Sequence, residues 1–426
     1  MINFQSYPEY KSTKYPWIGN LPTSWEVRRL KEVGRLFGGA GFPHEYQNLQ
    51  GEELYFYKVG DLSLSENGKT LLASPHSISK ETAKVLRATI IPENAIVYAK
   101  IGAALLLNRR RLTTAECCVD NNMTAYVTVA EKVTSEWAFY WLSTIDFGEH
   151  VNPGAVPSFS EGYQSVLPIP VPPVDEQEAI ARFLDFNTAQ IDALIAKKQT
   201  LLDKLAEKRT ALISHAVTKG LDPSVPMKDS KVEWLGEIPI NWKSISVRWL
   251  IRIGSGDFIS NTDTEFDYSE DAPVPVVGGN GIMAYTSKAN TPSNCIVIGR
   301  VGAYCGNVHF IKEPSWVTDN ALRVKIISDE VSAEFLILAL EAIGLNDYAN
   351  KNAQPLITGE MVKSKRIALP SSVEQVAICR YIGIVEDQIE KQTIKTKSAI
   401  DKLREYRSAL ITNAVTGKID VREWHE

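Results

Sequence analysis

Residues 176–218 read EQEAIARFLDFNTAQIDALIAKKQTLLDKLAEKRTALISHAVT, and a similar stretch occurs a second time in the chain. Shifted by 198 positions, it falls without a gap on residues 374–416, where nineteen of the 43 aligned residues are identical. A period of this length is too long for a solenoid repeat, so each copy belongs to a domain-sized unit. The sequence therefore predicts a pseudo-two-fold internal repeat.

The front and middle of each unit also repeat, but at other shifts. Trp17–Trp25 returns as Trp234–Trp242 after 217 positions, and Lys100–Gly102 returns as Arg300–Gly302 after 200. The glycine follows the second tryptophan by 77 positions in the first copy and by 60 in the second. Because loops absorb insertions and carry recognition, we expect this middle section to be specialised differently in the two units.

Each repeated stretch follows a proline-containing segment and contains no proline itself, which favours a helix. Apolar residues recur at alternating steps of four and three, the pattern of a coiled coil. A 43-residue helix is roughly 65 Å long, so the copies are expected to pair antiparallel and hold the two units apart. Independent amphipathic helices in two separate domains are the alternative. The predicted apolar seam is Leu184, Ile191, Ile195, Leu202, Leu205, Leu212, Ile382, Ile389, Ile400, Leu403 and Leu410.

The remaining sequence alternates short β-rich runs with glycine-rich turns, and two apolar segments, Trp137–Leu142 and Phe335–Leu340, are typical of short buried helices. The predicted fold class is therefore α+β, with two similar globular domains separated by the antiparallel helix pair. The expected boundaries are residues 1–165 and 223–367 for the globular domains, and 166–222 and 368–426 for the two spacer helices.

Composition excludes several classes of protein. The chain has 426 residues, 44% hydrophobic and 23% charged, which suits two domains with full cores. It contains no apolar run of about 20 residues and no signal pattern at its start, so we expect no membrane association and a cytoplasmic location. The five cysteines form no C-x-x-C pair and the six histidines no cluster, so reduced thiols and no metal site are expected.

The net charge of −5 hides an uneven distribution of basic residues. Asn94–Ala115 and Ala272–Lys312 contain no acidic residue, and the two windows overlap when the repeats are aligned. A solvated face could produce one such window, but two at corresponding places favour a basic patch in each unit. The candidate phosphate or base contacts are Lys100, Arg109, Arg110, Arg111, Lys288, Arg300 and Lys312.

Sequence motifs for catalysis are incomplete. Asn152–Ala155 lacks the second proline and the aromatic of the N-P-P-[FY] motif with which adenine methyltransferases grip a flipped base. Gly254–Gly256 lacks the third glycine of a dinucleotide-binding loop, since residue 259 is isoleucine. No nucleophile–histidine–acid set or carboxylate pair stands out. The sequence thus predicts a chain without catalytic residues of its own.

These features resemble the specificity (S) subunit of type I DNA restriction-modification systems. The resemblance rests on the doubled W-[IL]-G-x-[IL]-P-x-x-W block, on the junctions Pro168–Gln177 and Ala368–Gln375, and on the doubled A-V-T helix end. It covers essentially the whole chain, in one order of elements.

The resemblance implies a function and a set of partners. Two target-recognition domains would each read one half of a bipartite, asymmetric site in double-stranded DNA, while the helices set the spacing and dock two modification subunits. Those methyltransferase subunits would bind S-adenosylmethionine, and restriction subunits would use ATP and Mg, so no cofactor is expected on this chain. A coiled-coil scaffold without a DNA role and a methyltransferase–specificity fusion remain as alternatives.

Overall fold

The computed structural model describes residues 5–65, 67–152, 156–349 and 355–425. The motif fragment Asn152–Ala155 therefore lies partly outside the described residues. The chain divides into two compact units. Unit 1 consists of Met1–Gln199 and Ser398–Glu426, and unit 2 is Thr200–Lys397.

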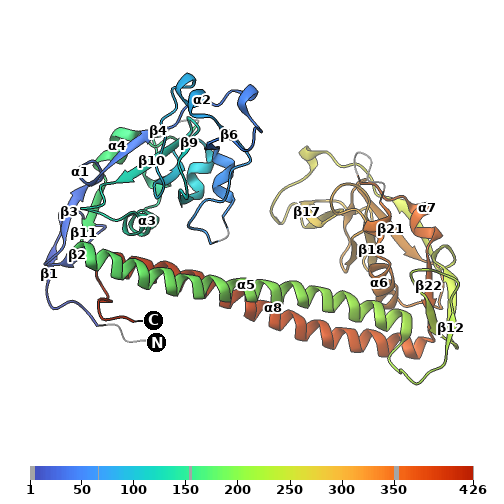
Figure 1. The fold of residues 1–426 in the computed structure, drawn as a ribbon. Coiled ribbons are helices and arrows are strands. Elements are labelled where there is room, and N and C mark those ends of the chain that lie inside the picture. Colours follow the sequence, from blue (N-terminus) through green and yellow to red (C-terminus); the bar gives the residue numbers. More distant parts are fainter. Residues whose placement is uncertain (1–4, 66, 153–155, 350–354, 426) are drawn as a thin grey trace. The chain divides into compact units, whose positions relative to one another are not determined.

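Two long helices dominate the secondary structure (Figure 1). Helix α5 runs over Val174–Lys219 and α8 over Ser372–Val415, so both repeated stretches are helical as predicted. Unit 1 contains the first part of α5 and the end of α8, whereas unit 2 contains the second part of α5 and the start of α8. Each compact unit therefore contains a part of both long helices.

Within each unit the two helix segments pack antiparallel, as predicted. In unit 1 the guanidinium of Arg407 lies 2.9 Å from the carboxylate of Asp192. In unit 2 Arg209 forms an ion pair with Glu386, from the first half of α8. These two arginines therefore each form an ion pair with an acidic residue of the facing helix. Six predicted seam residues are buried, Leu184, Ile191, Leu205, Ile382, Ile400 and Leu410, and the other five are half-buried.

The globular part of unit 1 is built on a four-stranded antiparallel sheet of order β4-β10-β7-β8 and a three-stranded sheet of order β6-β5-β9, in which β5 and β9 are parallel. Short pairs β1-β2 and β11-β3 complete it. The bounds are β1 Tyr10–Ser12, β2 Asn20–Pro22, β3 Glu26–Arg29, β4 Gly34–Gly38, β5 Leu54–Tyr57, β6 Ser77–Ile78, β7 Ile96–Ala99, β8 Arg110–Leu112, β9 Cys117–Val119, β10 Met123–Thr128 and β11 Pro168–Val171.

Unit 2 repeats this topology strand for strand. Its four-stranded antiparallel sheet has the order β15-β21-β18-β19, and its three-stranded sheet β17-β16-β20 again contains one parallel pair. The pairs β12-β13 and β14-β22 match those of unit 1. The bounds are β12 Met227–Asp229, β13 Glu237–Pro239, β14 Lys243–Ser246, β15 Ile251–Ser255, β16 Val274–Gly278, β17 Gly281–Thr286, β18 Cys295–Gly299, β19 Val308–Ile311, β20 Trp316–Val317, β21 Ala321–Ile326 and β22 Arg366–Leu369.

Short helices cover the sheets, and the two predicted buried ones are confirmed as α3 and α6. A threonine or serine caps each N-terminus: the side chain of Thr134 accepts from Trp137 N, and that of Ser332 accepts from Phe335 N. The shorter bounds are α1 Leu30–Val33, α2 Lys80–Val85, α3 Ser135–Ser143, α4 Glu161–Val166, α6 Ala333–Ala342 and α7 Gly359–Ser364. Among the described residues, none of the helices combines the length and apolar character needed to cross a membrane.

Candidate nucleic-acid interface

The doubled Glu-Gln and tryptophan motifs form one shared framework. In unit 1 the indole N–H of Trp25 donates to Oε1 of Glu176 at 2.9 Å. In unit 2 the indole of Trp242 donates to Oε1 of Glu374 at 3.0 Å. The repeated front of each unit is thus fastened to the first turn of a long helix, which explains why both motifs recur together.

The buried glutamines extend this framework to α3 and α6. Oε1 of Gln177 accepts from the backbone N–H of Thr134, the capping residue of α3, at 2.9 Å, and its amide donates to two backbone carbonyls. Oε1 of Gln375 accepts from Ser332, the capping residue of α6, at 2.8 Å, and its amide likewise donates to two carbonyls. Both side chains satisfy buried or partly buried backbone groups, which are costly to leave without a partner.

On this framework, several strand ends and turns gather at one edge of the sheets in each unit. Strand register places Gly38 opposite Thr124 and Ala99 opposite Met123 in unit 1, and the corresponding pairs recur in unit 2. We call this the glycine edge. It consists of Gly38–Gly41, Lys100–Gly102 and Asp120–Asn122 in unit 1, and of Ser255–Asp257, Gly278–Gly281, Arg300–Gly302 and Thr318–Asn320 in unit 2.

One glycine in each unit is required by close backbone approach. A Cβ on Gly39 would lie 1.8 Å from the carbonyl oxygen of Asp120, and one on Gly256 would lie 2.1 Å from that of Thr318. These glycines are related by the shift of 217 that also relates the tryptophan blocks. The sequence analysis did not identify Gly39 and Gly256 as an equivalent pair, although the shift of 217 aligns them.

Each glycine edge carries one cation at the same backbone position. The N–H of Lys100 donates to the carbonyl of Asn122 at 2.8 Å, and that of Arg300 donates to Asn320 at 2.9 Å. Two residues later Gly102 and Gly302 share a φ of 83°, which side chains disfavour. The predicted correspondence between Lys100 and Arg300 therefore extends to backbone geometry.

The surroundings of the two cations differ. Nζ of Lys100 lies 3.0 Å from the carboxylate of Glu161, so much of its charge is locally balanced. Arg300 donates to the hydroxyl of Ser255 at 3.1 Å and to the carbonyl of Asp319 at 3.4 Å, both uncharged acceptors. Its charge is therefore free to meet an anion such as a DNA phosphate.

The arginine triplet does not behave as one patch. Arg109 is exposed. Its neighbour Arg110 pairs with Tyr98 near the end of β7, which places Arg109 beside the glycine edge. Arg110 is 5% exposed; its guanidinium donates to the carbonyls of Asn108 and Ile145, and burial lowers its pKa to about 10. Burial, followed by the charge of Arg109, lowers the pKa of half-buried Arg111. Contact with DNA remains a prediction for all three residues, and the geometry favours it only for Arg109.

In unit 2, Lys288 and Lys312 lie away from Arg300. Strand β17 runs from the glycine edge towards Lys288, and β19 runs from it towards Lys312. Both lysines are exposed at the far ends of those strands, and the five residues of β16 alone span roughly 13 Å. The two lysines therefore form no single patch with Arg300.

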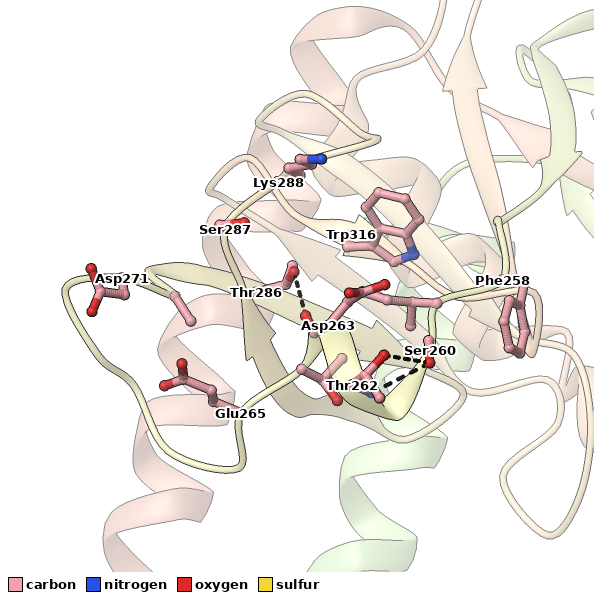
Figure 2. A pocket seen from close by; sticks show the side chains of 13 residues that line it. Phe258, Ser260, Thr262, Asp263, Glu265, Asp271, Thr286, Ser287, Lys288 and Trp316 are labelled. Carbon is pink, nitrogen blue, oxygen red and sulfur yellow. Dashed lines mark hydrogen bonds between the residues drawn. The ribbon is translucent and has the colours of Figure 1, made fainter.

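Lys288 instead borders an open pocket of about 500 Å³ (Figure 2). Figure 2 shows the lysine at the rim, with the carboxylates of Glu265 and Asp271 on the loop before β16. Asp263 is a third acid of this lining. Acidic side chains repel phosphate, so this pocket does not suit the DNA backbone.

Side chains that could bind a metal are not clustered in the part of the chain that the structure describes. That part contains no group of three or more His, Cys, Asp or Glu side chains arranged to hold a metal. All five cysteines are free thiols. Burial raises the pKa of Cys118 to about 11 and that of Cys117 further, which disfavours the reactive thiolate.

The fold and site define a chain of two equivalent α+β modules on paired helices, each with a cation at a glycine-lined edge. The sequence profile of the family described as the type I restriction modification DNA specificity domain matches residues 22–204 and 239–397. The chain belongs to this family.

Curated relatives and a solved structure agree with this assignment. The chain is 24% identical to the type I restriction enzyme EcoprrI specificity subunit of Escherichia coli, over 79% of this chain and 82% of the relative. It is 21% identical to the MjaIX specificity subunit of Methanocaldococcus jannaschii, over 99% of each. A chain from a structure on complex assembly and conformational transition of the type I R-M system has a TM-score of 0.69 and 13% identity, covering 93% of this chain and 98% of that chain; it shows the fold alone.

Proposed function

We propose that this chain is the DNA-specificity subunit of a type I restriction-modification complex, in which unit 1 and unit 2 each read one half of a bipartite, asymmetric site. The main support is the doubled glycine edge, with Lys100 and Arg300 on the same backbone framework. Glycine turns permit close approach of the backbone, and a cation beside them can contact phosphate or guanine. The different loop lengths of the two units support different half-sites.

The long helices would set the distance between half-sites and dock two modification subunits. Their partly exposed polar faces and paired seam support this role. Chemistry belongs, in this proposal, to the partners: methyl transfer from S-adenosylmethionine on the modification subunits, and ATP- and Mg-dependent cleavage on the restriction subunits. Residues 1–165 and 223–367 are the proposed recognition domains, and 166–222 and 368–426 the spacer segments.

A domain replacement tests independent reading by the two units. Residues 15–165 are replaced by a second copy of residues 235–365, the protein is produced with its modification subunits, and methylated positions are mapped along genomic DNA. We expect a palindromic target built from the second half-site of the natural protein. An asymmetric target after the replacement would contradict independent reading. A scaffold without a DNA role would give no sequence-specific methylation and no salt-dependent DNA binding.

A further inference from the structure

Each unit exposes a pair of adjacent, large apolar side chains beside its glycine edge. In unit 1 these are Leu106 and Leu107, 48% and 57% exposed, at the end of the 3-10 helix η3, Ala103–Leu107. In unit 2 they are Ile282 and Met283, 57% and 60% exposed, in β17. Neither the charge windows nor the repeat shifts identified these residues.

A β-bulge produces the pair in unit 2. Successive side chains of a strand point to opposite faces, so two neighbours are not normally both exposed on a half-buried strand. Here Val277 pairs with Ile282 and Val276 with Ala284, which leaves Met283 as the extra residue. Bulges turn side chains towards functional surfaces, and this one presents both apolar groups to solvent.

The hairpin that carries this pair is fixed to the glycine edge. A Cβ on Gly279 would lie 3.4 Å from Cα of Gly299, the residue before Arg300. His309 is within hydrogen-bond distance of the carbonyl of Gly279, at 3.2 Å. Ile282 and Met283 therefore belong to the same edge as Arg300.

The pair in unit 1 is held in place by its neighbours in sequence. Leu105 is buried and anchors η3. The amide of Asn108 donates to the carboxylate of Asp146 at 2.6 Å, and its oxygen accepts from the N–H of Phe147 at 2.8 Å. These contacts fix the segment that ends in Leu106 and Leu107, which lies in the sequence between Lys100 and Arg109.

The two pairs come from unrelated elements, a 3-10 helix in unit 1 and a bulged strand in unit 2. Duplication of the chain therefore does not account for an exposed apolar pair beside the glycine edge of each unit. A shared requirement at the glycine edge does, and Arg300, which meets uncharged acceptors, and exposed Arg109 suit contact with a polyanion. Apolar side chains beside phosphate-binding groups suit contact with base edges, where the thymine methyl is the apolar group.

We propose that Leu106-Leu107 and Ile282-Met283 determine base identity in their respective half-sites through apolar contact with thymine methyl groups. This inference rests on the proposed function and adds to it the residues that read bases and the chemical group they read. Lys100 and Arg300 position the DNA, and the apolar pairs discriminate between bases.

Double serine variants of each pair test the proposal in the full complex with modification subunits. Methylation mapping of Leu106→Ser/Leu107→Ser should show relaxed sequence in the first half-site alone, and Ile282→Ser/Met283→Ser in the second alone. Discrimination at the relaxed positions should fall about tenfold. Val85→Ser in unit 1 and Ile240→Ser in unit 2 remove exposed apolar side chains elsewhere and should leave both half-sites unchanged.

A second measurement uses the unmodified protein, so it does not depend on the folding of variants. Thymines of the natural target are replaced one at a time by deoxyuridine, which removes only the methyl group. We expect weaker binding at one or more positions in each half-site. Insensitivity to every such replacement, or unchanged half-sites in both double variants, would overturn the inference. Absence of any bipartite methylation by the unmodified complex would instead refute the proposed function.

Discussion

Glu176 and Glu374 occupy the same place in the two units, yet one is buried and the other exposed. Both accept a hydrogen bond from the tryptophan of the repeated front. In unit 1 the hydroxyl of Tyr7 also donates to Glu176, and the guanidinium of Arg422 lies 4.9 Å above the Tyr7 ring. In unit 2, among the residues that the structure describes, Glu374 accepts its hydrogen bonds from Trp242 and Ser371.

The same contrast extends along the helices. Trp424, near the end of the chain, packs 5.3 Å from the rings of both Phe183 and Phe186 on α5. Their counterparts on α8, Tyr381 and Ile384, are exposed, and Tyr381 borders an open pocket of about 660 Å³ in unit 2. The comparison separates a shared framework, made by glutamine and tryptophan, from the aromatic contacts of Trp424, which belong to unit 1.

The largest effect is expected where the two units agree. Gln177→Leu and Gln375→Leu each leave one partly buried N–H and two carbonyls without their partner. Each variant should lower the free energy of unfolding by about 3 kcal/mol, measured by urea denaturation. Gln190→Leu, at an exposed position of α5, is the control. A loss confined to one of the two variants would show that the framework is not shared.

A smaller effect is expected where the units differ. Trp424→Ala removes the ring that covers Phe183 and Phe186 and should destabilise unit 1 by about 2 kcal/mol. Hydrogen exchange should report the loss in the first half of α5 while unit 2 keeps its protection. Trp249→Ala removes an exposed tryptophan of unit 2 and should cost far less. Equal losses of stability in Trp424→Ala and Trp249→Ala would show that the packing of Trp424 against Phe183 and Phe186 adds no specific stabilisation.

The sequence could predict the helices because spacing and proline placement are local signals, and the repeat predicted that Lys100 and Arg300 occupy corresponding positions. It could not separate Arg109 from Arg110, because only the pairing of β8 with β7 decides which one faces the core. Lys288 belonged to the same acid-free window as Arg300, but hairpin direction places the two at opposite ends of their strands. The burial of Glu176 involves Tyr7 and Arg422, which are far from it in the sequence, so a local sequence pattern could not predict it.

The two cations offer a further contrast, in DNA binding. Glu161 balances Lys100, so Glu161→Gln should strengthen DNA binding by the full complex about threefold at low salt. Arg300→Ala should weaken it and reduce the slope of log affinity against log salt by about one. Arg248→Ala, at an exposed arginine before β15 and thus at the opposite end of that strand from Ser255, is the matched control. Fluorescence anisotropy over a salt series gives both quantities, and an unchanged slope for Arg300→Ala would remove this residue from the interface.

The smallest expected effect concerns Glu374, which is exposed whereas Glu176 is buried. Its partial burial raises the pKa, but hydrogen bonds from Trp242 and Ser371 outweigh this, and the pKa is lowered overall. A lowered pKa in the folded state stabilises the protein above the unfolded-state value of about 4.3, and this contribution is lost as pH falls through the folded-state value. Glu374→Gln should therefore destabilise unit 2 by less than ~1 kcal/mol at neutral pH and by progressively less below pH ~4. Urea denaturation at several pH values measures this, with Glu390→Gln on the exposed face of α8 as control. A difference between Glu374→Gln and the natural protein that stayed constant down to pH ~2 would show that the hydrogen bonds to Glu374 do not depend on its charge.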